Sequence, residues 1–134
     1  MTNTAAEDIC RFWFDEVDKA NWFKQSDEFD DELREKFSAL LEQAKNGDLD
    51  HWCDCAEGYL GLIIVLDQFS RNIHRDTAEA FAADDKALKL AKKLIDKELD
   101  KELTLEQRSF AYLPFRHAED LIMQHIGLKK TREI

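Results

Sequence analysis

Residues that break helices are scarce in this chain, which has four Gly and one Pro among 134 residues. A β-rich fold needs many turns, and turns depend on Gly and Pro, so this scarcity favours long helices. No stretch shows the strict alternation of apolar and polar residues that is typical of a half-buried strand. Apolar residues make up 44% and charged residues 36% of the chain, as in globular proteins. We therefore predict one all-α domain over residues 1–134.

Basic residues are also in short supply, with 19 Lys and Arg against 29 Asp and Glu and a net charge of −10. Such a surface repels phosphate backbones and anionic lipids, so we expect no nucleic acid partner and no binding to membranes. The longest apolar run, YLGLIIVL at residues 59–66, is far shorter than the roughly 20 residues that cross a bilayer. The N-terminus, MTNTAAEDIC, has acidic residues where a signal peptide has basic ones.

Cysteine is the third scarce residue, and the odd number of three does not suggest a disulfide framework. A reducing cytoplasm fits this content best. His51, Cys53 and Cys55 could bind a metal, but Cys-x-Cys is not the usual zinc spacing and no second Cys/His cluster completes four ligands. The chain also lacks a Gly-rich phosphate loop. We therefore expect no metal and no other cofactor.

Apolar residues at helical spacing predict five or six helices. Capping-box patterns mark helix starts at residues 4–7, 54–57, 76–79 and 104–107. An amphipathic helix that begins near residue 29 should end at Asn46-Gly47, where Gly supplies the left-handed conformation. Pro114 either kinks the last helix or stands in the first turn of a new one. Gly127 is predicted to end that last helix.

The stretch LIIVLDQFSRNIHR, residues 62–75, is the most informative part of the sequence. Its first residues are apolar around most of the helix circumference, which predicts a buried central helix from residue 54 to about 73. Asp67 and Arg71 are four residues apart, as are Gln68 and Asn72, so each pair shares a helix face. We expect a buried or half-buried Asp67–Arg71 ion pair, with Gln68 or Asn72 bonded to the backbone.

Three interpretations of these polar residues are open: a helix emerging into water, a buried structural network, and a ligand or catalytic pocket. Phe69 and Ile73 continue the apolar face beyond Asp67, which disfavours the first. The structural network is favoured because buried ion pairs often do no more than specify a fold.

The segment PFRHAEDLIMQH, residues 114–125, is the expected partner of this central helix. His117, Asp120 and Gln124 would share one helix face, and Arg116 could pair with Asp120. A His beside a carboxylate can transfer protons near neutral pH, although an ordinary hydrogen-bonded His is the commoner case. Because unpaired buried polar groups are costly, we expect His117 to contact the region from Asp67 to Asn72.

Several short segments also carry a resemblance. They are FWF (12–14), WF (22–23), FD (29–30), LDQFSRN (66–72), AFAADDKAL (80–88) and YLPFRHAED (112–120). In this order they resemble an uncharacterised bacterial family, domain-of-unknown-function family 924, over about residues 9–126. The resemblance implies an all-helical, TPR-like fold and a candidate site, but no activity, cofactor or substrate.

Two departures from the family pattern are visible. The family usually has His-Ser-Glu where this chain has His117-Ala118-Glu119, so any role of that hydroxyl is absent here. Family members also continue with further helix, whereas this chain stops at HIGLKKTREI. We therefore expect that a segment which covers part of the core, or closes the polar site, is missing.

The predicted architecture is a set of TPR-like antiparallel helical hairpins around a central buried helix. The leading functional hypothesis is a non-catalytic binding or interaction module, whose small polar pocket takes a protein, a peptide or a small polar ligand. Its binding residues would be Asp67, Gln68, Arg71, Asn72, His117 and Gln124. The alternative is a small-molecule enzyme in which His117 is the acid/base and Arg71 an anion clamp, together with Asp67 and Asp120.

The C-terminal segment predicts self-association. Phe115, Leu121, Ile122, Met123 and Ile126 occupy more than one side of the last helix, and Leu128 and Ile134 add further apolar surface. One neighbouring hairpin cannot cover all of it, and large exposed apolar patches are uncommon on monomers. We expect a two-fold homodimer through this helix.

Overall fold

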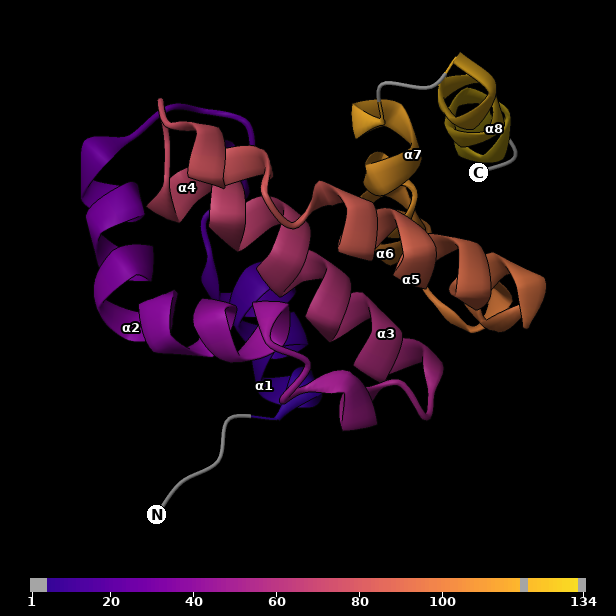
Figure 1. Ribbon diagram of the computed structural model, residues 1–134, viewed down its shortest axis with the longest axis horizontal. Coiled ribbons are helices and arrows are strands. Elements are labelled where there is room, and N and C mark those ends of the chain that lie inside the picture. Colours follow the sequence, from indigo (N-terminus) through magenta and orange to yellow (C-terminus); the bar gives the residue numbers. More distant parts are fainter. Residues whose placement is uncertain (1–4, 119–120, 133–134) are drawn as a thin grey trace.

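The computed structural model describes residues 5–118 and 121–132 (Figure 1). The described residues form helices and turns without a β-strand, so the all-α class is confirmed. The α-helices are α1 (Ala6–Arg11), α2 (Asp27–Lys45), α3 (Ala56–Ile63), α4 (Ser70–Ile73), α5 (Asp84–Asp96), α6 (Leu105–Ala111), α7 (Leu113–His117) and α8 (Leu121–Arg132). Two π-helical segments are η1 (Phe12–Glu16) and η4 (Ile64–Phe69). The 3-10 helices are η2 (Lys19–Asn21), η3 (Asp50–Trp52), η5 (Ala78–Phe81) and η6 (Leu99–Glu102).

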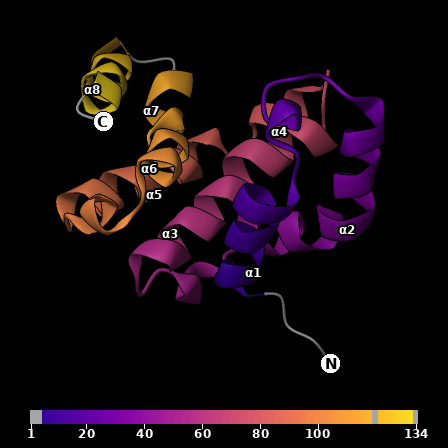
Figure 2. The ribbon, with the colours of Figure 1, turned by 180° about the vertical axis from the view of Figure 1, so that it is seen from behind.

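The central helix of the fold consists of α3, η4 and α4 joined end to end. Every residue from 58 to 70 is buried, as the sequence predicted. In Figures 1 and 2 this helix crosses the middle of the molecule, with α1 and α2 on one side and α5 on the other. Packing of α3 against both α1 and α5, and of η4 against both α2 and α5, agrees with that arrangement. The TPR-like arrangement of hairpins stays a prediction.

Aromatic side chains from distant segments meet on this central helix. The ring of Phe69 is stacked on Phe37 at a centroid distance of 4.8 Å and lies 5.8 Å from Trp13. Trp13 in turn contacts Phe110 edge-on at 5.7 Å. Such pairs add specific geometry to the apolar area that they bury. The first helical segment therefore docks on the core through Trp13, which is fully buried.

Some helix ends lie where the sequence places them. Thr104 and Gln107 form the predicted capping box, in which Thr104 Oγ1 accepts from the Gln107 N–H at 3.1 Å and Gln107 Oε1 accepts from the Thr104 N–H at 3.0 Å. Helix α2 ends at Lys45 with Asn46 as its C-cap residue, and Gly47 has φ of +90°, the left-handed conformation expected there.

Three predicted starts are wrong. Helix α1 begins at Ala6 after the cap residue Ala5, whose N–H donates to Asp8, while Thr4 lies outside the described residues. Helix α3 begins at Ala56 with Cys55, not Asp54, as its cap residue. Thr77 precedes the short η5, and α5 starts only at Asp84. In each case the helix begins later than the capping-box pattern predicted.

The C-terminal helices differ from the prediction at a glycine. Pro114 stands in the first turn of the separate helix α7, which was one of the two predicted alternatives. Gly127, however, does not end a helix, because α8 continues to Arg132. A Cβ atom at Gly127 would lie 2.7 Å from the Cβ of Phe115, closer than real Cβ atoms come. This glycine therefore permits the close approach of α8 to α7.

Helix α8 lies beside α7 at one end of the molecule (Figure 1). Phe115, predicted to contribute to the surplus apolar surface, is buried in the core. Ile122 is 68% exposed and Leu128 is 42% exposed, whereas Met123 and Ile126 are half-buried. Ile134 lies outside the described residues. Among the described side chains of this segment, the exposed apolar surface is thus smaller than the sequence suggested, and the homodimer stays a prediction.

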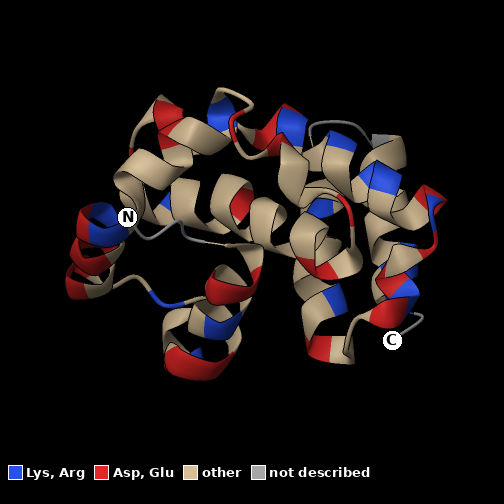
Figure 3. Cartoon of the chain, turned by 90° about the horizontal axis from the view of Figure 1, so that it is seen from below, with Lys and Arg blue, Asp and Glu red and all other residues tan. Residues whose placement is uncertain are grey.

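Charged residues of both signs are interspersed over the helices in Figure 3. In the described part of the chain, no helix combines the length and the apolar character that crossing a bilayer requires.

If α8 forms a two-fold seam, the chain should have twice its monomer mass of 15.7 kDa in light scattering at micromolar concentration. An interface of roughly 1,200–2,000 Å² in total is the usual size for such a dimer. Ile122→Asp should then give monomers, because it places an unpaired charge in the seam. A monomer mass that does not change on concentration contradicts the dimer.

Candidate functional site

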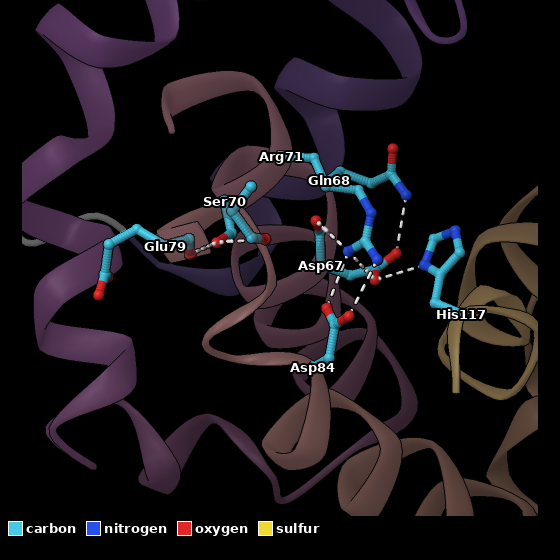
Figure 4. Close-up of polar contacts among 8 residues, drawn as sticks. Asp67, Gln68, Ser70, Arg71, Glu79, Asp84 and His117 are labelled. Atoms are coloured by element: carbon cyan, nitrogen blue, oxygen red, sulfur yellow. Dashed lines mark hydrogen bonds and ion pairs between the residues drawn. The ribbon is translucent and has the colours of Figure 1, made fainter. Parts of the chain in front are cut away.

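The carboxylate of Asp67 is the centre of the polar cluster on the central helix. Its side chain is 1% exposed and lies in the π-helical segment η4. Oδ1 accepts from Arg71 Nη1 at 2.8 Å, and Oδ2 accepts from Gln68 Nε2 at 2.8 Å. His117 Nδ1 from α7 also lies 2.8 Å from Oδ1 (Figure 4). A buried carboxylate needs such partners, and π-helical turns often occur at functional sites.

The predicted Asp67–Arg71 ion pair is therefore present, but the guanidinium of Arg71 has a second carboxylate partner. Arg71 Nη1 and Nη2 donate to the two oxygens of Asp84 at 2.9 and 3.0 Å, a bidentate geometry (Figure 4). The ring of Phe81 lies 5.3 Å from the guanidinium carbon, within cation–π distance. Arg71 thus joins the central helix to the start of α5.

Sequence reasoning did not identify Asp84 as a site residue. Arg71 and Asp84 are on different helices, so no helical spacing relates them. The one available signal was the segment AFAADDKAL, residues 80–88, which contributed to the family resemblance and contains Asp84.

His117 reaches Asp67 as predicted, and the hydrogen bonds around it assign its tautomer. The Asp67 carboxylate already accepts from a guanidinium, so it acts as the acceptor for His117 Nδ1–H. In the neutral imidazole, Nε2 then carries the free lone pair. The side chain of His117 is 26% exposed, so the ring connects the buried carboxylate with the surface.

The predicted shared face of His117, Asp120 and Gln124 is wrong, because α7 ends at His117 and Ala118 is extended. The exposed side chain of Gln124 donates to the Ala118 carbonyl at 2.6 Å and not to a residue of the Asp67 cluster. Asp120 lies outside the described residues.

Asn72 belongs to a second buried cluster, centred on Asp30 of α2. Asn72 Nδ2 donates to Asp30 Oδ1 at 2.9 Å, and Arg75 donates to both oxygens of the same carboxylate at 2.6 and 3.1 Å. The hydrogen bond with Asp30 raises the pKa of Arg75. The expected backbone bonds of Gln68 and Asn72 are therefore replaced by bonds to carboxylates. Asn72 stabilises the packing of α4 on α2, away from His117.

A cavity of about 900 Å³ lies over Arg71 and His117. Its wall on α5 is formed by Asp85, Leu88 and Lys92, and the facing wall includes Ala118 and Met123. Asp84 and Phe81 complete the lining. The volume is within the range of small-molecule sites, which combine apolar lining with a few polar groups. The fold thus places two of the predicted binding residues, Arg71 and His117, in one cavity, with Asp67 directly behind them.

Two of the cysteines, Cys10 and Cys53, show no sign of activation. The described residues hold no group of three or more His, Cys, Asp and Glu side chains that could bind a metal, His51, Cys53 and Cys55 included. Burial raises the pKa of Cys10 to about 12, and its thiol donates to the Glu57 carbonyl at 3.7 Å. Burial also raises the pKa of Cys53. Both changes disfavour the thiolate, which is the nucleophilic form.

Replacing Asp67 by Asn should lower the free energy of unfolding by about 3–5 kcal/mol, because Arg71 loses its buried carboxylate partner and the new amide places a donor against one of the three donors that Asp67 accepts from. Asp31→Asn is the matched control, since its ion pair with Arg34 is exposed and should contribute less than about 1 kcal/mol. Urea unfolding followed by circular dichroism measures both changes. Equal small losses in the two variants would show that the Asp67 cluster contributes no more than a surface pair.

Comparison with known proteins agrees with the resemblance of the short segments. Residues 9–134 match the family described as bacterial protein of unknown function, DUF924. A solved structure, the protein of unknown function ATU0120 from Agrobacterium tumefaciens, is 34% identical in sequence with a TM-score of 0.90. The alignment covers 96% of this chain and 72% of that one. No curated protein matches the chain. The chain therefore belongs to the DUF924 family of bacterial proteins of unknown function.

Proposed function

We propose that the protein is a binding module whose ligand is a small polar molecule held in the cavity over Arg71 and His117. One observation carries this proposal: the same buried carboxylate, Asp67, orients both side chains, and both line one cavity. Groups held in this way meet a ligand without losing further side-chain entropy, which favours binding.

The dimensions of the cavity favour a small molecule over a protein or peptide partner. A volume of about 900 Å³ suits a ligand of small-molecule size. A TPR-like groove for peptides rests on analogy between folds alone. Of the predicted binding residues, Arg71 and His117 face the ligand in this proposal, and Asp67 and Gln68 hold them in place. Asn72 and Gln124 are bonded elsewhere and have no part in it.

A thermal-shift screen against a library of small metabolites tests the proposal. Ala118 lines the cavity, so Ala118→Trp should fill part of it and abolish the shift produced by a ligand. Ala39→Trp on the exposed surface of α2 is the control and should leave the shift unchanged. Ligands whose shifts survive in Ala118→Trp bind elsewhere and contradict this site.

A second candidate function is a small-molecule enzyme, and the orientation of His117 favours it. A carboxylate bonded to Nδ1–H leaves Nε2 as the proton acceptor, which is the arrangement of a general base in many hydrolytic sites. The predicted role of Arg71 as an anion clamp fits less well, because Nη1 and Nη2 are already bonded to carboxylates. Arg71 would act instead by positioning Asp67.

Two substitutions of His117 separate the roles of its ring nitrogens. The amide of His117→Asn can replace the Nδ1–H donor to Asp67 but has no group at the position of Nε2. His117→Gln places its amide near the position of Nε2 but loses the Nδ1 contact. If His117 is a general base, turnover of a ligand found in the screen should fall at least about 100-fold in His117→Asn, while binding persists. Full turnover in this variant would contradict the enzyme.

A further inference from the structure

One face of α5 presents an ordered pattern of charge to the cavity. Asp85, Leu88 and Lys92 line it at positions i, i+3 and i+7, so they follow one another along the helix. Asp85 and Lys92 are exposed, and neither side chain has a hydrogen bond or ion pair with a residue that the structure describes. At about 1.5 Å per residue they stand about 10 Å apart along the axis, too far to pair with each other.

The end of the cavity at Asp85 is acidic. Asp85 lines it together with Asp84, and Asp67 lies just behind. The guanidinium of Arg71 pairs with Asp67 and Asp84, and the carboxylate of Asp85 has no cationic partner among the described residues. His117 in its neutral form adds a further acceptor at Nε2. This surplus of negative charge and of hydrogen-bond acceptors suits a cation that donates several hydrogen bonds, such as a primary ammonium group.

The rest of the cavity has a different character. Leu88 is half-buried and lies between Asp85 and Lys92 along α5, and half-buried Met123 adds apolar surface to the lining. Lys92, two helical turns from Asp85, supplies a positive charge that suits a carboxylate. Read along α5, the cavity therefore offers an acidic end, an apolar middle and a basic end.

We propose that the cavity recognises an elongated zwitterion, with its ammonium group at Asp85 and His117, a hydrocarbon chain against Leu88 and Met123, and its carboxylate at Lys92. This inference rests on the proposed function of the same cavity. An ω-amino carboxylic acid has this chemistry. A tripeptide, at about 3.3–3.6 Å per extended residue, has similar length and end groups. The apolar middle favours the hydrocarbon chain, because apolar side chains do not satisfy the hydrogen bonds of peptide groups.

Isothermal titration calorimetry with ω-aminooctanoate, whose extended length matches the separation of Asp85 and Lys92, tests the inference. Lys92→Glu should weaken binding at least about tenfold, since it places like charges together. Lys89→Glu is the matched control, because Lys89 is an exposed residue of α5 outside the cavity lining and the change in net charge is the same. It should weaken binding less than about twofold. Circular dichroism checks that both variants remain folded.

Analogues of the probe separate the contributions of its parts. Octanoate and octylamine each lack one charged end and should bind more weakly than ω-aminooctanoate. Lys92→Glu should reverse the preference and bind octanediamine more tightly than ω-aminooctanoate. Trialanine tests whether the ligand is a peptide. If trialanine binds more tightly than ω-aminooctanoate and this binding is lost in Lys92→Glu, the ligand is still a zwitterion but its middle is not a hydrocarbon chain.

Two results would overturn the inference. One is the absence of ω-aminooctanoate binding to the unmodified protein. The other is equal weakening by Lys92→Glu and Lys89→Glu, which would show an effect of net charge alone. Neither result decides the proposed function. The thermal-shift screen, with Ala118→Trp as the variant that should abolish the shift, tests the cavity independently of ω-aminooctanoate.

Discussion

The carboxylate of Asp67 is the constraint on which the rest of this structure depends. It is buried within the central helix, where an unpaired charge would be very costly. Arg71 and Gln68 on the same helix supply two donors, but His117 must come from α7 to supply the third. Asp84 in turn holds the other edge of the Arg71 guanidinium. One buried charge thereby joins α5 and α7 to the central helix.

The C-terminal helices have the geometry that this connection requires. Helix α7 is only five residues long, begins with Pro114 in its first turn and ends at His117. Gly127 then allows α8 to approach α7 closely, since a larger residue would collide with Phe115. As a result Ala118 and Met123 face α5 across the cavity. The wall of the cavity is thus a consequence of how His117 is brought to Asp67.

Membership of the DUF924 family does not assign a function, so the function has to be argued from the site. The second cluster, in which Asn72 and Arg75 both donate to the carboxylate of Asp30, illustrates a purely structural role. The Asp67 cluster differs because two of its members, Arg71 and His117, also line a cavity of about 900 Å³. That difference makes the Asp67 cluster, and not the Asp30 cluster, the candidate functional site.

The sequence by itself determined the all-α class, the buried central helix, the cap at Thr104 and the Asp67–Arg71 pair. Each follows from helical periodicity or from partners at most four residues apart, so neighbouring residues encode it. The contact of His117 with Asp67 was also predictable, because buried polar groups need partners. Only the tertiary structure decided that Asp84 binds Arg71, that Asp30 binds Asn72, and that Leu88 and Lys92 face His117 across a cavity. These contacts join separate helices, and the packing of whole helices, not local spacing, sets which side chains meet.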